Sequence, residues 1–88
     1  MRPLTPDQML AVADQFCERF PVRVRDYSAL AAAAAVPGAR FRGVAVHDSP
    51  VRAAEALRDT VERLEPLTSG NDEFAQVCAL LYRRLAED

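Results

Sequence analysis

Apolar residues recur every three or four positions in four stretches of the chain, and each stretch is bounded by residues that typically begin or end helices. The first stretch opens on Thr5-Pro6-Asp7-Gln8, a capping box with proline at the first helical position. Pro21 ends it, because a proline ring is not tolerated in a helix interior. The pattern predicts an amphipathic helix whose apolar side comprises Met9, Leu10, Val12, Ala13, Phe16, Cys17 and Phe20.

Three more helices are predicted on the same grounds. The second starts near Asp26, continues through an alanine run to Ala35 and stops at Val36-Pro37-Gly38. The third begins with the cap-plus-proline pair Ser49-Pro50, and the fourth begins at Ser69 or Asn71. The expected inner faces are Ala53, Ala54, Leu57, Val61 and Leu64 in the third helix, and Phe74, Val77, Cys78, Leu81 and Leu85 in the fourth.

Two connecting segments have patterns of their own. Residues 22–25 alternate between apolar and charged side chains, which favours a short extended link. Residues 39–48 form the longest loop, in which residues 44–46 are expected to form a brief extended flap. The predicted fold is therefore all-α: a single domain over residues 1–88, built as a small bundle of four or at most five helices.

Composition narrows the classes of function. Half of the residues are apolar, so the chain can bury a core without metal or disulfide support, and we expect no cofactor and no metal. The net charge of −2 argues against nucleic-acid binding, and no apolar run is long enough to span a membrane. Every basic residue is arginine, which excludes a P-loop lysine. Cys17 and Cys78 lack metal-ligand spacing and are expected to be free thiols of a cytoplasmic protein.

The segment from Glu65 to Glu73 has the most specific pattern in the chain. Gly70-Asn71 opens a predicted helix, and the amides at a helix start attract phosphate. Glu65, Asp72 and Glu73 surround that position with negative charge, which a phosphate site would not tolerate. A simpler interpretation stays open, because serine, asparagine and acids are also ordinary residues for the first turn of a helix.

Together with this loop, three stretches of the chain resemble the Doc branch of the Fic/Doc toxin family. Residues 5–13 resemble its opening helix, residues 24–30 its second helix start, and residues 49–64 the helix before its active-site loop. The resemblance implies a fold that transfers part of ATP to a hydroxyl of a target protein. Fic enzymes move AMP, and Doc toxins move phosphate onto elongation factor Tu. Doc-like toxins continue for one or two further helices, so the resemblance also implies a bundle that is short at its C-terminus.

Five positions depart from the family's loop. Glu65 stands where the resemblance places the general-base histidine, and Ser69 stands where it places the magnesium-holding acid. Glu73 stands at the first phosphate-gripping arginine, and Gln76 stands at the second. Asp72 occupies the position directly after Gly-Asn. The resemblance therefore implies that the base, the metal ligand and the phosphate clamps are all missing.

The positions that shape the loop persist: Pro66, Gly70 and Asn71 are retained, and Leu67 replaces phenylalanine as the apolar anchor. An arginine-to-glutamate change turns attraction into repulsion, and like charges ~4 Å apart cost about 4 kcal/mol at an effective dielectric near 20. We therefore expect a catalytically inactive protein that acts by binding, in a toxin–antitoxin type of system. The alternatives are a divergent AMP- or phospho-transferase with Glu65 as base, and a generic helical interaction module.

Other residues suggest further sites. Arg40, Phe41 and Arg42 form a basic-aromatic cluster that suits a protein-facing surface, and His47 follows in the same loop. A histidine there is either a surface residue or a relocated general base. The acids of the Glu65–Glu73 segment are an alternative ligand set for a hard cation. We expect a protein partner and a homodimer formed through an exposed apolar face, and we expect no nucleic acid or membrane partner.

Overall fold

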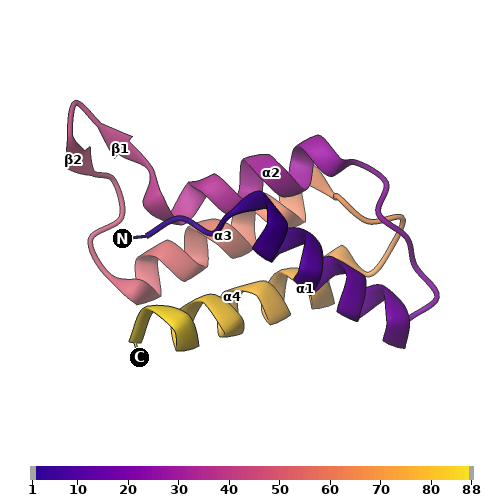
Figure 1. Ribbon diagram of the computed structural model, residues 1–88. Helices are drawn as coiled ribbons and strands as arrows, with labels where there is room; N and C mark the ends of the chain where they lie inside the picture. Colours follow the sequence, from indigo (N-terminus) through magenta and orange to yellow (C-terminus); the bar gives the residue numbers. More distant parts are fainter. Residues whose placement is uncertain (1, 88) are drawn as a thin grey trace.

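Four helices make up most of the structure, a computed structural model that describes residues 2–87 (Figure 1). Met1 and Asp88, the ends of the expected 1–88 domain, lie outside the described residues. No helix within residues 2–87 has the length and apolar character needed to cross a membrane. The elements are α1 (Pro6–Arg19), α2 (Tyr27–Ala35), a 3₁₀ turn (Val36–Gly38), β1 (Arg40–Phe41), β2 (Val44–Ala45), α3 (Pro50–Leu64) and α4 (Asn71–Glu87).

The predicted helix starts are confirmed by their capping hydrogen bonds. The Thr5 hydroxyl accepts from the Gln8 amide at 3.0 Å, and the Gln8 side chain accepts from the Thr5 amide at 2.8 Å. The Asp26 carboxylate caps α2, and the Ser49 hydroxyl caps α3. These starts were predictable because each cap depends only on residues within one turn.

A short hairpin corrects the all-α prediction. Strands β1 and β2 pair antiparallel, with Arg40 opposite Ala45 and Phe41 opposite Val44. The tip residues Arg42 and Gly43 have positive φ angles of 52° and 82°, as a tight two-residue hairpin turn requires. The expected flap thus exists as the second strand. The full hairpin was not predicted, because strands of two residues are too short to show an alternating pattern.

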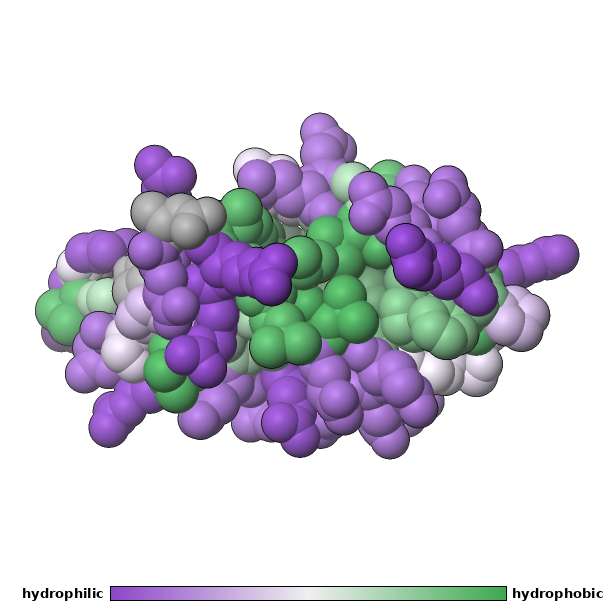
Figure 2. Space-filling view, turned by 90° about the horizontal axis from the view of Figure 1, so that it is seen from below, coloured by the Kyte–Doolittle hydropathy of each residue, from purple (hydrophilic) through white to green (hydrophobic). Residues whose placement is uncertain are grey.

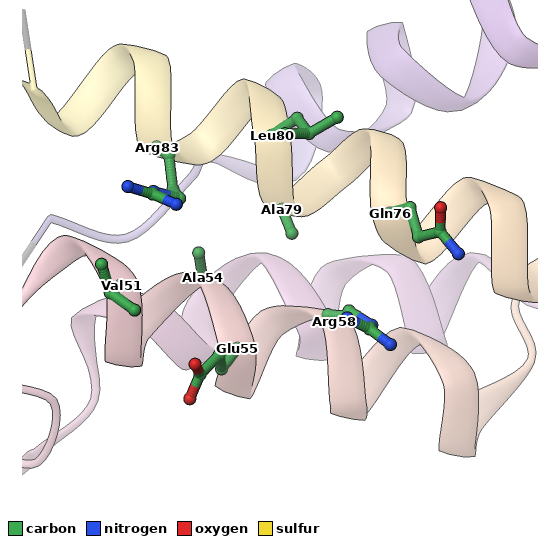
Figure 3. Close-up of a pocket in the computed structure, with 8 residues that line it drawn as sticks. All are labelled: Val51, Ala54, Glu55, Arg58, Gln76, Ala79, Leu80 and Arg83. Atoms are coloured by element: carbon green, nitrogen blue, oxygen red, sulfur yellow. The ribbon is translucent and has the colours of Figure 1, made fainter.

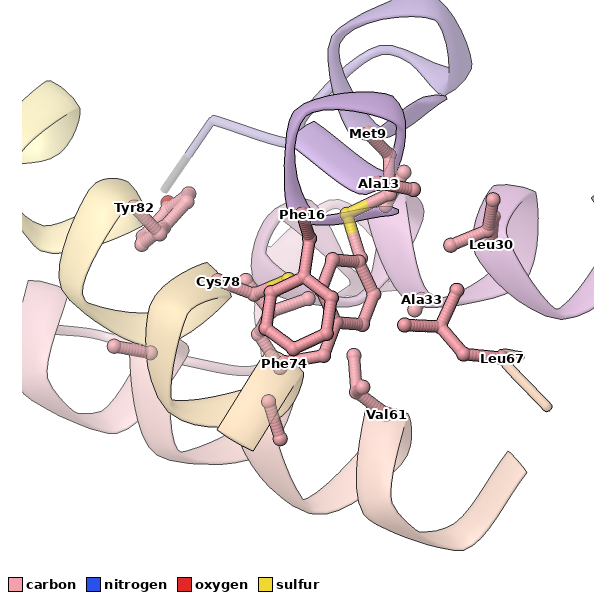
Figure 4. Close-up of a cluster of buried hydrophobic side chains, with 14 of the residues drawn as sticks. Met9, Ala13, Phe16, Leu30, Ala33, Val61, Leu67, Phe74, Cys78 and Tyr82 are labelled. Atoms are coloured by element: carbon pink, nitrogen blue, oxygen red, sulfur yellow. The ribbon is translucent and has the colours of Figure 1, made fainter. Parts of the chain in front are cut away.

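The helices place the hairpin and the 65–70 loop at opposite ends of the molecule (Figure 1). Helix α3 runs from the hairpin to the loop, and α4 returns alongside it in the opposite direction. Helices α1 and α2 pack over this pair and enclose the core. Within it, the ring centroids of Phe16 and Phe74 lie 5.3 Å apart (Figure 4). The largest fully buried side chains are Phe74, Met9, Leu57, Leu67, Val61, Pro37 and Pro66.

The predicted inner face of α4 is wrong in its last turns. Leu81 and Leu85 are 39% and 59% exposed, whereas Tyr82 is only 2% exposed. The Tyr82 hydroxyl donates to the Arg2 carbonyl at 2.7 Å, which satisfies the one polar group that burial of this ring would otherwise leave unpaired. The buried face therefore follows Phe74, Cys78 and Tyr82, and two leucines remain outside. At the ends of α1 and α3, Phe20 and Leu64 are also exposed rather than inward-facing as predicted.

Candidate functional site

The loop between α3 and α4 is held in place by the extended segment that precedes α2. An antiparallel bridge joins Val24 to Leu67, and the Arg25 amide donates to the Pro66 carbonyl at 2.7 Å. The Leu67 side chain points into the core beside Val61 (Figure 4) and is 1% exposed, which confirms it as an apolar anchor. The extended link predicted for residues 22–25 thus positions the loop.

Side chains reinforce this attachment at both ends of the loop. The Thr68 amide donates a backbone hydrogen bond to the Arg23 carbonyl at 2.9 Å, and the Thr68 hydroxyl accepts one from the Arg23 amide at 3.1 Å. The Arg25 guanidinium donates to the carbonyls of Leu64 and Glu65, where the negative end of the α3 dipole lies. Thr68 and Arg25 were not predicted as part of the site, because contacts across some forty residues leave no local signal.

Asn71 closes the loop on itself. Its side-chain Oδ1 accepts from the Leu67 amide at 2.9 Å, and its Nδ2 donates to the Leu67 carbonyl at 3.0 Å. Gly70, with a φ of +68°, supplies the left-handed turn that brings Asn71 back to Leu67. The carboxamide of Asn71 is therefore a loop-forming group, and α4 begins at this residue.

Burial separates the two groups of loop positions. The positions that resemble the family loop are buried or half-buried: Pro66, Leu67, Gly70 and Asn71. The positions that depart from it are all exposed: Glu65, Ser69, Asp72, Glu73 and Gln76. The buried side chains of the first group pack the loop, whereas the side chains of the second group are what the loop presents to solvent.

A hollow of about 300 Å³ lies over the start of α4, and its lining is acidic. It is bordered by Glu62, Glu65, Thr68, Ser69, Gly70, Asn71, Asp72 and Glu73. Four of these residues are carboxylates and none is basic, although Arg58 pairs with Glu62 at 3.2 Å from outside the hollow. The resulting field repels anions. Glu62 was not predicted as part of the site, because its place on the charged face of α3 is typical of a solvated residue.

The alternative of a hard-cation site is not supported. Within residues 2–87, no group of three or more His, Cys, Asp or Glu side chains is arranged to hold a metal ion. Asp72 and Glu73 are adjacent on α4, and adjacent helix positions point about 100° apart. The carboxylates of the hollow therefore add to one negative potential, but they do not converge on a point where a cation could be held.

Gln76 is the one exposed position of the loop pattern that does not line the hollow. Together with Leu80, Glu55 and Arg58 it lines a groove of about 350 Å³ between α3 and α4 (Figure 3). The groove has a mixed lining, in which Arg58 and Arg83 border apolar side chains from opposite helices. The position where the resemblance places a second arginine therefore faces α3 instead of the loop.

His47 lies too far from the loop to serve as a relocated base. It precedes α3, whereas Glu65 follows the same helix. The 15 residues of α3 span roughly 22 Å at 1.5 Å per residue, so the two residues lie at opposite ends of that length. His47 is half-buried and lies between β2 and α3, at the opposite end of α3 from the loop.

The hairpin presents the predicted basic-aromatic cluster to solvent. Phe41 is 69% exposed, and the Arg42 guanidinium lies 5.6 Å from the centroid of its ring. Arg40 donates to the carbonyl of Gly43 and so braces the turn from inside. Val44 and Val46 are exposed beside them. The hairpin therefore carries exposed apolar and cationic side chains on a turn that an internal hydrogen bond holds in place.

A scan against protein-family models matched no family, and searches of curated proteins and of solved structures found no match. The resemblance to the Fic/Doc family therefore stays a prediction from the sequence.

The role of Asn71 in the loop is testable by unfolding. We expect Asn71→Ala to lower the free energy of unfolding by about 1–3 kcal/mol, because it leaves both backbone groups of the buried Leu67 unpaired. Asn71→Asp keeps the acceptor but loses the donor, so its loss should be smaller. Urea titrations should show the exposed control Gln76→Ala close to wild type. An Asn71→Ala variant as stable as that control would show that the carboxamide does not hold the loop.

Proposed function

We propose that this chain is a protein-binding domain of Fic/Doc descent that has lost nucleotide transfer. The observation that carries the proposal is the division of the loop by burial. The buried or half-buried positions keep residues that resemble the family loop, with Leu67 in place of phenylalanine, whereas three of the five exposed positions, Glu65, Asp72 and Glu73, are acidic. Selection for folding alone would keep the buried residues. Once no phosphate had to bind, the exposed residues would be free to change.

The chemistry of the hollow supports the inactive half of this proposal. Transfer from ATP requires preorganised positive groups around the phosphates, each worth roughly 10²-fold in rate. The hollow instead offers four carboxylates. Glu65 is exposed, and an exposed glutamate is a weak general base for an alcohol. The lining of the hollow therefore offers no positive group to bind ATP and no strong base to activate the target hydroxyl.

The hairpin supports the binding half. Aromatic and arginine side chains supply much of the energy of protein interfaces, and Phe41 with Arg42 offers both on a braced turn. The turn stands clear of the helices at the far end from the loop (Figure 1). Its positive charge and apolar side chains suit an acidic protein surface with an exposed apolar patch. A regulatory role in a toxin–antitoxin type of system fits a domain that acts only by binding.

The binding half predicts that one hairpin substitution strongly weakens capture of a partner. We expect Phe41→Asp to weaken retention of a partner from a lysate of the source cells by at least about tenfold, as for an interface hot spot. Tyr27→Asp is the matched control, because Tyr27 is a similarly exposed aromatic residue at the start of α2. Quantitative mass spectrometry of the captured proteins supplies the measurement. Equal retention by wild type and Phe41→Asp would refute the hairpin as the binding surface.

A further inference from the structure

Helix α4 has an outward face with the spacing of a coiled-coil seam. Glu73, Val77, Leu80 and Arg84 follow one another at intervals of four, three and four residues. Leu80 is 65% exposed in the middle of this seam, and Leu81 lies next to it. The face seen from below shows apolar side chains gathered at its centre with polar ones around them (Figure 2).

An apolar groove of about 380 Å³ lies beside this seam, between α4 and α1. Its walls include Leu4, Val12, Leu81 and Leu85, and its polar lining consists of Gln8 and Arg84. No acidic residue lines it. A second helix laid along α4 would remove the exposed leucines from water, which stabilises association by about 25 cal/mol per Å² of apolar surface.

The charges on α4 indicate which helix would dock there and in which direction it would run. Acidic residues, Asp72 and Glu73, lie in its first turn, and basic residues, Arg83 and Arg84, lie near its end. Two copies of α4 that pack antiparallel around a twofold axis place Glu73 of each opposite Arg84 of the other. The same register places Val77 opposite Leu80. The seam is therefore complementary to itself in both charge and apolar character.

We propose that a second copy of this chain docks on this face, with the two α4 helices antiparallel and two Glu73–Arg84 pairs flanking a Val77–Leu80 centre. The proposal goes beyond the function proposed above, which places the other partner at the hairpin. Because the two surfaces are separate, the dimer and the hairpin complex can form independently.

Charge reversal gives the dimer a specific test by sedimentation equilibrium. Glu73→Arg and Arg84→Glu each convert two symmetry-related attractions into two repulsions, so each variant should have a dimer dissociation constant about tenfold or more above wild type. An equimolar mixture of the two variants should dimerise again, because one chain then carries both cations and the other carries both anions. Recovery in the mixture is the expected result.

Controls separate this geometry from a general effect of charge. Asp59→Arg and Arg63→Glu reverse exposed charges on α3 and should leave the dimer unchanged. Leu80→Asp should leave a folded monomer, as checked by circular dichroism. A wild type that stays monomeric at millimolar concentration would overturn the proposal. So would a dimer that ignores both charge reversals, or variants whose mixture dimerises no better than either alone. None of these outcomes affects partner capture by the hairpin, so failure here is distinct from failure of the proposed function.

Discussion

Inorganic tripolyphosphate is expected to bind the double variant Glu65→Lys/Asp72→Arg about a hundredfold more tightly than it binds the wild type. Both side chains line the hollow at the start of α4, so the substitutions exchange two of its four carboxylates for cations. The helix start already offers amides to an anion, and the side chains are what repel it. Removing the repulsion should therefore create an anion site on an unaltered loop.

A variant with the same change in total charge distinguishes a local site from a general effect. Asp14→Lys/Asp59→Arg alters exposed residues that do not line the hollow, and it should gain little affinity. Isothermal titration calorimetry at low and at physiological salt measures both variants, and the gain should shrink as salt screens the charges. If the control gains as much as the hollow variant, the loop has no phosphate-binding shape left.

Raising the pH should destabilise the protein steeply between about pH 9 and pH 12, through Cys78. Burial raises the pKa of this thiol from its ordinary value of 9.0 to about 12. A raised pKa means that the folded state holds the proton more tightly than the unfolded state, so the contribution to stability is complete below pH 9. It is lost as the pH rises toward the folded pKa, by about 4 kcal/mol for a shift of this size.

Replacement of the thiol tests this assignment. Cys78→Ala should be less stable at neutral pH because of the cavity it leaves, but its free energy of unfolding should fall much less between pH 8 and pH 11. A smaller decline in the same direction should remain, because burial also raises the pKa of the Tyr82 phenol. Cys17→Ala is the comparison, since Cys17 is only half-buried. Urea titrations across this pH range give the slopes. An unchanged slope in Cys78→Ala would show that another group governs alkaline unfolding.

The parts of the fold that depend on neighbouring residues were predictable from the sequence. Thr5, Asp26 and Ser49 each cap a helix through a residue three positions on, so their signals are local. The order of helices and the inner face of α3 up to Val61 followed from periodicity. Leu67 was expected to be an apolar anchor because the resemblance places a phenylalanine at its position, and its side chain is buried.

The parts that depend on contacts between distant residues were not predictable. Burial of Tyr82 in place of Leu81 depends on the Arg2 carbonyl, which lies eighty positions away in the sequence. The attachment of the loop by Arg25 and Thr68 likewise pairs segments far apart. Glu62 joined the acidic hollow only once α3 was placed beside the loop. In each case a three-dimensional neighbour, and not the local pattern, decides the role of the residue.

Calorimetric titration of the wild type with magnesium-ATP tests most directly whether the loop has lost its nucleotide. We predict no binding heat and no rise in melting temperature up to millimolar nucleotide, because the acidic hollow repels the phosphates. A dissociation constant in the micromolar range would contradict the proposed loss of nucleotide transfer.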